Sequence, residues 1–340
     1  MFSPENAHNL SLMGLKLGLL GSSNPITSPC LKTSLWGLDF PNPIGLAAGY
    51  DKNAEVPNAI LELGFGSTEV GTITPKAQPG NPRPRIFRLQ EDEAIINQLG
   101  FNNKGLEATQ LRLKKINTQG RSGIIGANVG ANKTSRDPTQ DYVIGLKALE
   151  GLADYYVINI SSPNTPGLRA LQSKNALENL LKRTIEARNN FKKWAPLLLK
   201  VAPDLTPEDI KDISEVALNK KIDGLVISNT TISRPLNLKS KNKTQGGGLS
   251  GKPLLGLSTK TLAEFYKLIG GKIPLIGVGG VNNGISAYKK VKSGASLIQI
   301  YSALVYEGPS IAGKVALELE TLLQKDGFKS LKDAIGADLK

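Results

Sequence analysis

The stretch from Asn159 to Arg169 collects residue types that are suited to holding and acting on a small polar ligand. It reads Asn-Ile-Ser-Ser-Pro-Asn-Thr-Pro-Gly-Leu-Arg and follows the apolar, strand-like run 155–158. Its two prolines fix φ and stiffen the loop, so the amides and hydroxyls between them are held in place. Asparagine donates and accepts hydrogen bonds at once, which suits the carbonyl and N–H edge of a planar heterocycle. The alternative interpretation is a proline-rich turn whose side chains cap its own backbone.

Similar side chains follow the other strand-like segments. They lie in the runs 47–52, 71–75, 97–103, 228–231 and 277–280 and at Asn128, Asn159, Ser162, Lys200, Tyr301 and Ser302. Asparagine, lysine, serine and glycine recur at these positions, with few acids and no histidine. Such a set favours an anionic, polar and planar ligand.

A lysine and a glycine-rich turn strengthen the case for an anion. Lys200 ends an apolar strand, where an ammonium is costly unless it meets an anion, and a salt bridge to a nearby acid is the alternative. The turn 277–280 (Gly-Val-Gly-Gly) follows the seventh strand-like run, where barrel enzymes bind phosphate on backbone N–H groups. It is a poor dinucleotide fingerprint, because Asn282 occupies the position of the third glycine.

The chain has one histidine, His8, and one cysteine, Cys30. A Ser-His-Asp triad would have to take its base from the far N-terminus, and a Cys/His zinc site is not available. Cys30 cannot form an internal disulfide, which fits a reducing compartment, and we interpret it as structural. No metal site is expected.

Apolar runs of strand length alternate with runs of helix length through most of the chain. The strand-like runs are 43–49, 65–74, 123–130, 155–161, 196–202, 224–230, 274–280 and 297–303, and a small hairpin is expected at 35–40. Helix-like runs include 53–63, 175–194, 206–219, 257–269, 285–293 and 310–324. This alternation predicts parallel βα units closed as a (β/α)8 TIM barrel, an α/β fold, with an open doubly wound sheet as the alternative.

Two insertions interrupt the alternation, at 75–106 and 233–254. Both follow the carboxyl ends of strand-like runs, the face on which barrel enzymes build their sites. We interpret them as lids or ligand walls, with solvent-exposed loops as the alternative.

The N-terminal segment 6–20 places His8, Leu12, Leu15 and Leu19 at helical spacing. This pattern predicts a short helix that either packs on the body of the protein or forms an interfacial wall for a lipophilic ligand. We therefore divide the chain into an N-terminal helical extension, residues 1–30, and a barrel, residues 31–340.

Composition restricts the class of partner. Lys and Arg number 42 against 29 Asp and Glu, a net charge of +13 over 340 residues, which favours anionic partners. Aromatic residues make up only 5%, which argues against stacking on single-stranded nucleic acid. No apolar run reaches the roughly 20 residues of a spanning helix, and no secretory signal is expected.

Several long motifs, in order along nearly the whole chain, resemble dihydroorotate dehydrogenase. They are GLAAGYDK (45–52), PGNPRPRIFRL (79–89), INQLGFNN (96–103), NISSPNTPGLR (159–169), GGLSG (247–251) and IGVGG (276–280). Serine at position 162 and the N-terminal helix are similar to the quinone-dependent class, since the soluble class uses cysteine there. The resemblance implies oxidation of dihydroorotate to orotate in pyrimidine biosynthesis, with a hydride passing to FMN and electrons then to a membrane quinone.

The resemblance also implies a role for individual residues. Ser162 matches the catalytic base that takes the C5 proton. The residues that match the substrate pocket are Lys52, Asn97, Gln98, Leu99, Gly100, Phe101, Asn159, Asn164, Asn229 and Thr230. The residues that match FMN contacts are Ala48, Gly49, Tyr50, Asp51, Lys52, Thr72, Asn128, Asn159, Lys200, Ser228, Gly251, Gly280, Tyr301 and Ser302. The family usually has threonine in place of Ser228, and the hydroxyl is kept.

Serine is a poor base at neutral pH, and no histidine stands beside Ser162 in the sequence. A proton relay through Thr165 and water would complete the reaction, and Lys52 would lower the cost of a transient alkoxide. Positive charge at Lys200 would stabilise an anionic reduced flavin. For the quinone, the resemblance suggests His8, Arg88 and Tyr301.

Longer members of the family begin with a further helix, and this chain starts at about the second one. The expected location is the cytoplasmic side of the cell membrane, as a peripheral monomer that does not bind nucleic acid. The alternatives are a soluble fumarate- or NAD-linked dihydroorotate dehydrogenase and another FMN barrel enzyme such as a tRNA dihydrouridine synthase. Ser162 and the N-terminal helix argue against the first, and Cys30, away from any strand end, argues against the second.

Overall fold

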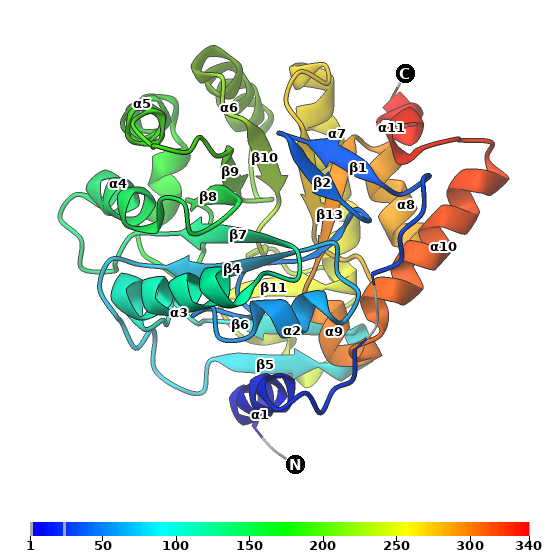
Figure 1. The fold of residues 1–340 in the computed structure, drawn as a ribbon, viewed down its shortest axis with the longest axis horizontal. Helices are drawn as coiled ribbons and strands as arrows, with labels where there is room; N and C mark the ends of the chain where they lie inside the picture. The colour runs from blue at the N-terminus through cyan, green and yellow to red at the C-terminus, as the bar shows by residue number, and fades with distance from the viewer. Residues whose placement is uncertain (1–2, 23–24, 340) are drawn as a thin grey trace.

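The computed structural model describes residues 3–22 and 25–339, and eight parallel strands close into a barrel within this part of the chain (Figure 1). The strand order around the barrel is β10-β12-β13-β3-β4-β7-β8-β9. Its strands are β3 (Ile44–Leu46), β4 (Ser67–Ile73), β7 (Ile124–Val129), β8 (Tyr155–Asn159), β9 (Leu197–Val201), β10 (Gly224–Ile227), β12 (Leu275–Val278) and β13 (Ala295–Ile300). Seven of them lie within a predicted run, and β13 begins at Ala295, two residues before the run predicted at 297–303. The predicted TIM barrel is confirmed, and the open doubly wound sheet is wrong.

Helices surround the barrel on the outside (Figure 1). They are α2 (Pro57–Leu61), α3 (Gly105–Gln119), α4 (Pro138–Leu149), α5 (Lys174–Asn189), α6 (Pro207–Lys220), α7 (Leu255–Ile269), α8 (Gly284–Lys292), α9 (Ser302–Glu307), α10 (Ile311–Lys325) and α11 (Leu331–Ala334). The start of α6 shows how local sequence fixes a boundary. Thr206 Oγ1 accepts from the Asp209 amide at 3.1 Å, the Asp209 carboxylate accepts from the Thr206 amide, and Pro207 is the first helical residue.

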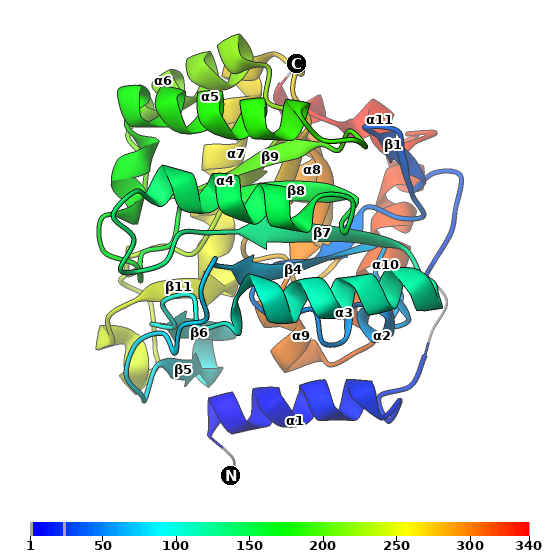
Figure 2. The ribbon, with the colours of Figure 1, turned by 60° about the vertical axis from the view of Figure 1, so that its left-hand side comes forward.

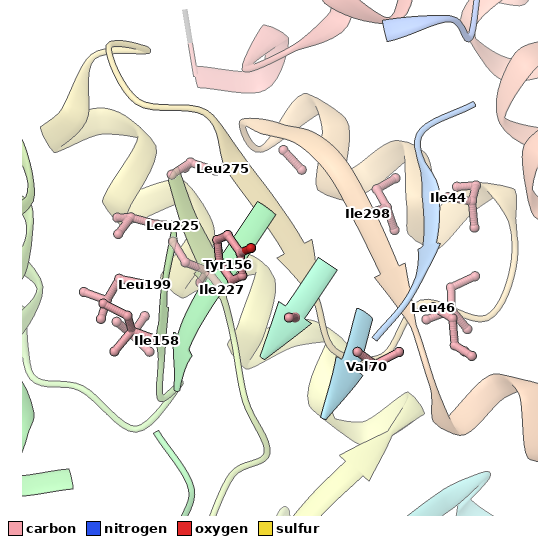
Figure 3. Packing of buried hydrophobic residues seen from close by; sticks show 14 of the residues in the cluster. Ile44, Leu46, Val70, Tyr156, Ile158, Leu199, Leu225, Ile227, Leu275 and Ile298 are labelled. Carbon is pink, nitrogen blue, oxygen red and sulfur yellow. The ribbon is translucent and has the colours of Figure 1, made fainter. Parts of the chain in front are cut away.

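Alternate residues of the barrel strands point inward and outward, and this alternation builds two apolar layers. Outward side chains pack under the helices; Figure 3 shows Tyr156 and Ile158 of β8 with Leu199 of β9 in this layer. The intervening residues, such as Val157 and Leu198, fill the barrel interior. Because both faces of each strand are buried, most of the strands appear in the sequence as largely apolar runs, with β4 (STEVGTI) as the exception.

The expected hairpin closes one end of the barrel. β1 (Thr33–Leu35) pairs antiparallel with β2 (Leu38–Phe40). Trp36, between them, packs on Phe40 and Tyr155 with ring centroids 6.4 and 6.3 Å away, and its Nε1 donates to the Asp223 carbonyl at 2.7 Å. The interior layer is therefore sealed at the end opposite the cavity described below.

The two insertions form one structure. β5 (Ile86–Leu89) and β6 (Ala94–Asn97) come from the first insertion and β11 (Gly248–Gly251) from the second, and they pair as an antiparallel sheet in the order β11-β6-β5. Leu89, Ile96 and Leu249 bury their side chains together beneath it. The insertions are thus an ordered wall and not separate solvent loops.

The N-terminal helix α1 (Pro4–Lys16) lies outside the barrel, packed against β5 and α2 (Figure 2). It begins and ends a few residues earlier than the predicted run 6–20. Ser3 caps it, accepting from the Asn6 amide at 3.3 Å. In the part of the chain that the structure describes, no helix is both long enough and apolar enough to cross a bilayer.

Candidate active site

A cavity of about 440 Å³ opens at the C-terminal ends of the barrel strands, between the barrel, the insertion sheet and α1. Most of the predicted site residues line it: His8, Ala48, Gly49, Tyr50, Lys52, Thr72, Arg88, Asn97, Leu99, Gly100, Phe101, Asn159, Ser162, Asn164, Lys200, Ser228, Asn229, Thr230, Gly251, Gly280, Tyr301 and Ser302. Asp51, Gln98, Asn128 and Thr165 are not among the lining residues. The barrel topology therefore gathers residues that are spread over almost 300 positions of sequence.

Hydrogen-bonded side chains from adjacent strands form the floor of the cavity. Thr72 Oγ1 donates to Asn128 Oδ1 at 2.6 Å, and Asn159 Nδ2 donates to Thr72 Oγ1 at 2.9 Å and to Asn128 Oδ1 at 3.2 Å. Asn128 is fully buried, and its Nδ2 donates to Glu69 Oε1 at 2.7 Å. Asn128 thus supports Thr72 and Asn159 from behind, while those two face the cavity.

The network continues from β8 to β10 through Asn159 Oδ1. This oxygen accepts from Ser161 Oγ at 2.9 Å and from Asn229 Nδ2 at 3.3 Å, and Asn229 Nδ2 also donates to Ser161 Oγ at 3.0 Å. Asn229 Oδ1 accepts from the Thr230 amide at 2.7 Å. With so many fixed partners, both asparagine side chains are held in one orientation before any ligand binds.

The loop after β8 presents Ser162 to the cavity. Ser162 is buried, and its Oγ accepts from the Asn164 amide at 3.3 Å. Thr165 Oγ1 is also buried and has no hydrogen-bond partner within the described chain. A buried hydroxyl without a partner indicates that a water or ligand completes its hydrogen bonding. Arg169 Nε donates to the Ser161 carbonyl at 3.2 Å and braces the loop.

The first insertion meets this loop across the cavity. Asn164 Nδ2 donates to Asn97 Oδ1 at 3.0 Å, and Asn97 Nδ2 donates to the Gly248 carbonyl at 3.4 Å. Gln98 Nε2 donates to the Gly246 carbonyl at 2.9 Å. The Gln98 side chain therefore ties the two insertions together, which is a different place from the substrate pocket that the resemblance implied.

Backbone of the first insertion closes one side of the cavity. Gly100 and Phe101 both have positive φ, at 68° and 56°. The Leu99 carbonyl accepts from the Asn81 amide at 3.0 Å, and the carbonyls of Gly100 and Phe101 accept from Gln78 Nε2 at 3.2 and 3.1 Å. These bonds fix a left-handed turn whose residues line the cavity.

Lys52 brings a positive charge to the cavity from the loop after β3. Its Nζ donates to the Gly49 carbonyl at 2.6 Å. Burial lowers the pKa of Lys52 to about 8, with the nearby Glu5 carboxylate acting in the opposite direction. An anion that bound here would favour the charged ammonium.

Asp51 and Tyr50, the neighbours of Lys52, serve different purposes. The Asp51 carboxylate is buried and accepts from the amides of Glu55 and Val56 at 2.7 and 2.8 Å. It therefore caps the turn before α2, and its side chain does not reach the cavity. Tyr50 lines the cavity, and its hydroxyl lies 2.8 Å from Ser11 Oγ of α1.

Lys200, the fourth residue of β9, reaches the cavity from inside the barrel. It is buried, and it forms no ion pair with any residue in the described ranges. Burial lowers its pKa, and the nearby Glu69 carboxylate opposes that effect. The salt bridge considered from the sequence is not formed, so the ammonium remains available to an anionic or electron-rich ligand.

Glycine turns form the wall beside β12 and β13. Gly279 and Gly280 have φ of 105° and 80°, and their amides donate to no other residue of the described chain. A Cβ on Gly280 would lie 2.5 Å from Leu255 N, so only glycine fits. Ser302 Oγ lies 2.8 Å from Ser250 Oγ. Unpartnered amides with serine hydroxyls beside them suit a phosphate group.

A second branch of the cavity leads from Tyr301 toward α1. Tyr301 donates to the Gly49 carbonyl at 3.0 Å and packs edge-on against Tyr50, which packs edge-on against His8 with ring centroids 5.0 Å apart. Burial lowers the pKa of His8 to about 4, so its imidazole is neutral at pH 7. Arg88 also lines this branch. The three predicted quinone residues therefore share one space.

The acid inside the barrel was not among the residues predicted from the sequence. Glu69 is buried in β4, where its Oε2 accepts from Gln299 Nε2 at 2.7 Å, and Gln299 lines the cavity. A carboxylate in the middle of the strand-like run 65–74 was the available signal. Ser11 and Ser250 were also missed, although Ser250 lies within the GGLSG motif; no motif contained Ser11. In the ranges 3–22 and 25–339, no cluster of His, Cys, Asp and Glu is arranged to hold a metal.

Comparison with known proteins shows the same family over the whole chain. A family model described as dihydroorotate dehydrogenase matches residues 30–323. A dihydroorotate dehydrogenase (quinone) from Xanthobacter autotrophicus is 52% identical over 343 residues, covering 99% of this chain and 96% of its own length. One of the same name from Rhodospirillum rubrum is 52% identical over 337 residues, covering 98% and 91%.

Solved structures agree in fold. The crystal structure of DHODH from Eimeria tenella in complex with ferulenol is 41% identical, with a TM-score of 0.95 over 98% of this chain and 95% of the other. The ligand-free form is 40% identical, with a TM-score of 0.96 over 99% of each chain. The chain therefore belongs to the dihydroorotate dehydrogenase family.

Proposed function

We propose that this protein oxidises dihydroorotate to orotate in pyrimidine biosynthesis, using FMN, and delivers the electrons to a quinone. One observation carries the proposal. Ser162 lies in the same cavity as Lys52, Lys200 and the four asparagines predicted to bind substrate, and the branch toward α1 opens from that cavity. The names of the relatives support the substrate and the quinone. The tRNA dihydrouridine synthase alternative is not favoured by these comparisons.

The residues present fit FMN. The uncommitted amides of Gly279 and Gly280, with Ser302 beside them, suit its phosphate. The buried, unpaired ammonium of Lys200 favours negative charge on an adjacent ring, and Thr72 and Asn159 offer side chains at the cavity floor. FMN, when bound, supplies the acceptor for the C6 hydride and the route for electrons to the quinone.

The asparagines and Lys52 would hold the substrate. Asn97 and Asn164 face it from the insertion side and Asn159 and Asn229 from the barrel side, so amides on both sides can pair with the carbonyl and N–H groups of the pyrimidine. Lys52 would pair with the substrate carboxylate. Because their partners hold these side chains in place, little ordering is needed on binding.

Ser162 would accept the C5 proton. Its hydroxyl needs a route by which its own proton leaves, and Thr165, three residues on, has a buried hydroxyl with a free hydrogen-bonding position. A water between the two would complete a relay toward the loop surface. The Lys52 ammonium would lower the energy of negative charge on the serine oxygen.

The branch toward α1 would receive the quinone, with His8, Arg88 and Tyr301 around it. Several large apolar side chains of this region are exposed, namely Leu10, Met13, Leu17 and Leu19. Exposed apolar side chains on α1 and on the turn after it favour peripheral attachment to a membrane surface. We place the protein at the cytoplasmic side of the cell membrane, as a monomer. One chain supplies every side chain assigned here, so the site needs no residue from a second subunit.

An anaerobic absorbance titration of the purified protein tests the proposal. Dihydroorotate should bleach the flavin bands, and a short-chain ubiquinone should restore them, whereas fumarate or NAD should not. Bleaching followed by recovery with fumarate or NAD would instead indicate the soluble subtype. A bound flavin that dihydroorotate does not bleach would reject the substrate.

A further inference from the structure

Lys290 of α8 is a buried lysine that the proposed reaction does not use. Its side chain has no exposed surface (0%), and it forms no ion pair with the residues that the structure describes. Its Nζ donates to Ser258 Oγ at 2.6 Å and to the Val278 carbonyl at 3.3 Å. A buried ammonium without a counter-ion costs free energy, which an apolar side chain of similar size would avoid.

The contacts of Lys290 lead to the glycine turn after β12. Ser258 Oγ, which accepts from Lys290, donates to the Gly279 carbonyl at 2.9 Å. Val278, the other acceptor, directly precedes the turn. Gly279 and Gly280 line the cavity, whereas Lys290 does not. The ammonium therefore lies behind the turn, one hydrogen-bonded residue away from it.

The cavity wall near the turn offers little other free positive charge. Lys252 lines the cavity, but its ammonium is paired with Glu93 Oε1 at 2.9 Å. A phosphate bound to the amides of Gly279 and Gly280 would contact neutral donors on the cavity side of the turn. The Lys290 charge would lie on the other side of the turn. In the dry interior between them, that charge is weakly screened.

We propose that Lys290 is a positioning residue for the flavin phosphate, holding the glycine turn through Ser258 and Val278 and supplying the positive charge behind it. The inference rests on the proposed use of FMN and goes beyond it, because it assigns a residue outside the cavity. Burial, with a smaller contribution from the neighbouring Lys289 charge, lowers the pKa of Lys290 well below that of a free lysine. A bound phosphate would favour its protonated form.

The test compares FMN with riboflavin, which has the same ring system but no phosphate. Apoprotein is titrated with each flavin, and the dissociation constants are read from flavin fluorescence. Lys290→Met keeps the length of the side chain and removes its charge and its hydrogen bonds. We expect it to raise the FMN dissociation constant by about tenfold or more, and to change that of riboflavin less than about twofold.

Lys289→Met is the matched control, because Lys289 is exposed on the same helix and its loss changes net charge equally. It should leave both dissociation constants unchanged. The ³¹P resonance of bound FMN should shift in Lys290→Met and stay in place in Lys289→Met. If Lys290→Met changes the dissociation constants of FMN and riboflavin by the same factor, or changes neither, the inference is overturned and Lys290 is a packing residue.

Ser258→Ala provides a second test of the inference if Lys290→Met does not fold. It keeps the Lys290 charge but cuts the link to the Gly279 carbonyl, so the preference for FMN over riboflavin should fall. A preference equal to that of the wild type would again overturn the inference. A wild-type protein that binds no flavin would instead reject the cofactor itself, whereas one that binds FMN but is not reduced by dihydroorotate would reject only the substrate.

Discussion

Asn164 Nδ2 donates a 3.0 Å hydrogen bond to Asn97 Oδ1, and this contact joins the loop after β8 to the last residue of β6. The two asparagines come from different parts of the fold, one from the barrel and one from the insertion sheet. Each already has a partner, since Asn97 Nδ2 also reaches the Gly248 carbonyl. The pair therefore forms one preorganised unit on the insertion side of the cavity.

Truncation of this pair should weaken substrate binding in a non-additive way. Asn97→Ala and Asn164→Ala should each raise the KM for dihydroorotate about fivefold or more, because each leaves the remaining amide without its partner as well as removing a ligand contact. The double variant should lose less than the product of the two factors, since the shared bond is lost only once. Steady-state kinetics of the wild type, the two single variants and the double variant give the four KM values of a double-mutant cycle.

Asn237→Ala is the control, because Asn237 is exposed on the second insertion and lies outside the cavity. Its KM should equal that of the wild type. If the increase in KM of the double variant equals the product of the increases in the two single variants, the two asparagines act independently.

Removal of the Ser162 hydroxyl should separate flavin binding from flavin reduction. Ser162→Ala should slow anaerobic bleaching by dihydroorotate by about 100-fold or more, since a general base typically contributes that much, while the flavin stays bound. Thr165→Val, which keeps the shape and loses the hydroxyl, should slow it by a smaller factor of about ten. Ser173→Ala, at an exposed position after the same loop, should leave the rate unchanged. Stopped-flow absorbance measures all four; a normal rate in Ser162→Ala would remove the serine from the chemistry.

The barrel and the cavity-facing strand ends were predictable because the signals are local. A strand buried on both faces is a short apolar run, and Asn159 or Lys200 at its end is visible as an abrupt change of polarity. The sheet β11-β6-β5 was not predictable. Asn97 pairs with Gly248 across 151 positions, and nothing in the sequence of either segment indicates which strand it pairs with.

Burial of single charges was equally hard to foresee. Lys289 and Lys290 look alike in the sequence, yet one is exposed and the other is completely buried. Asp51 lies in a motif that suggests ligand contact, but its carboxylate caps backbone amides. Such differences depend on which face of an element meets the rest of the fold, and a single helical turn of sequence does not determine that.

The charge of Lys52 should make ligand binding depend on pH. Burial lowers its pKa to about 8, so the ligand-free protein loses this positive charge as the pH rises through about 8. If the substrate carboxylate pairs with protonated Lys52, as we propose, the dissociation constant of orotate should rise by up to about tenfold per pH unit above that value. Lys52→Met should bind more weakly and without this pH dependence. Lys260→Met, at an exposed lysine of α7, should follow the wild-type profile; a pH-independent wild type would exclude Lys52 as the carboxylate partner.

Attachment of α1 should weaken in mild acid because of His8. Its pKa is lowered from 6.5 to about 4 by burial, so the docked helix disfavours the proton that the released helix accepts. The contribution of neutral His8 is therefore complete above about pH 6.5 and falls by at most about 1.4 kcal/mol per pH unit as the pH drops toward 4. The Glu5 carboxylate on the same helix has its pKa lowered by the hydrogen bond from Arg85, so it remains ionised through the upper part of this window. Hydrogen exchange of α1 amides, corrected for intrinsic rates, should accelerate between pH 6.5 and 4.5, while that of α6 should not. His8→Phe keeps an aromatic ring against Tyr50 and removes the titration, so acceleration of the same size in that variant would show that another group releases the helix.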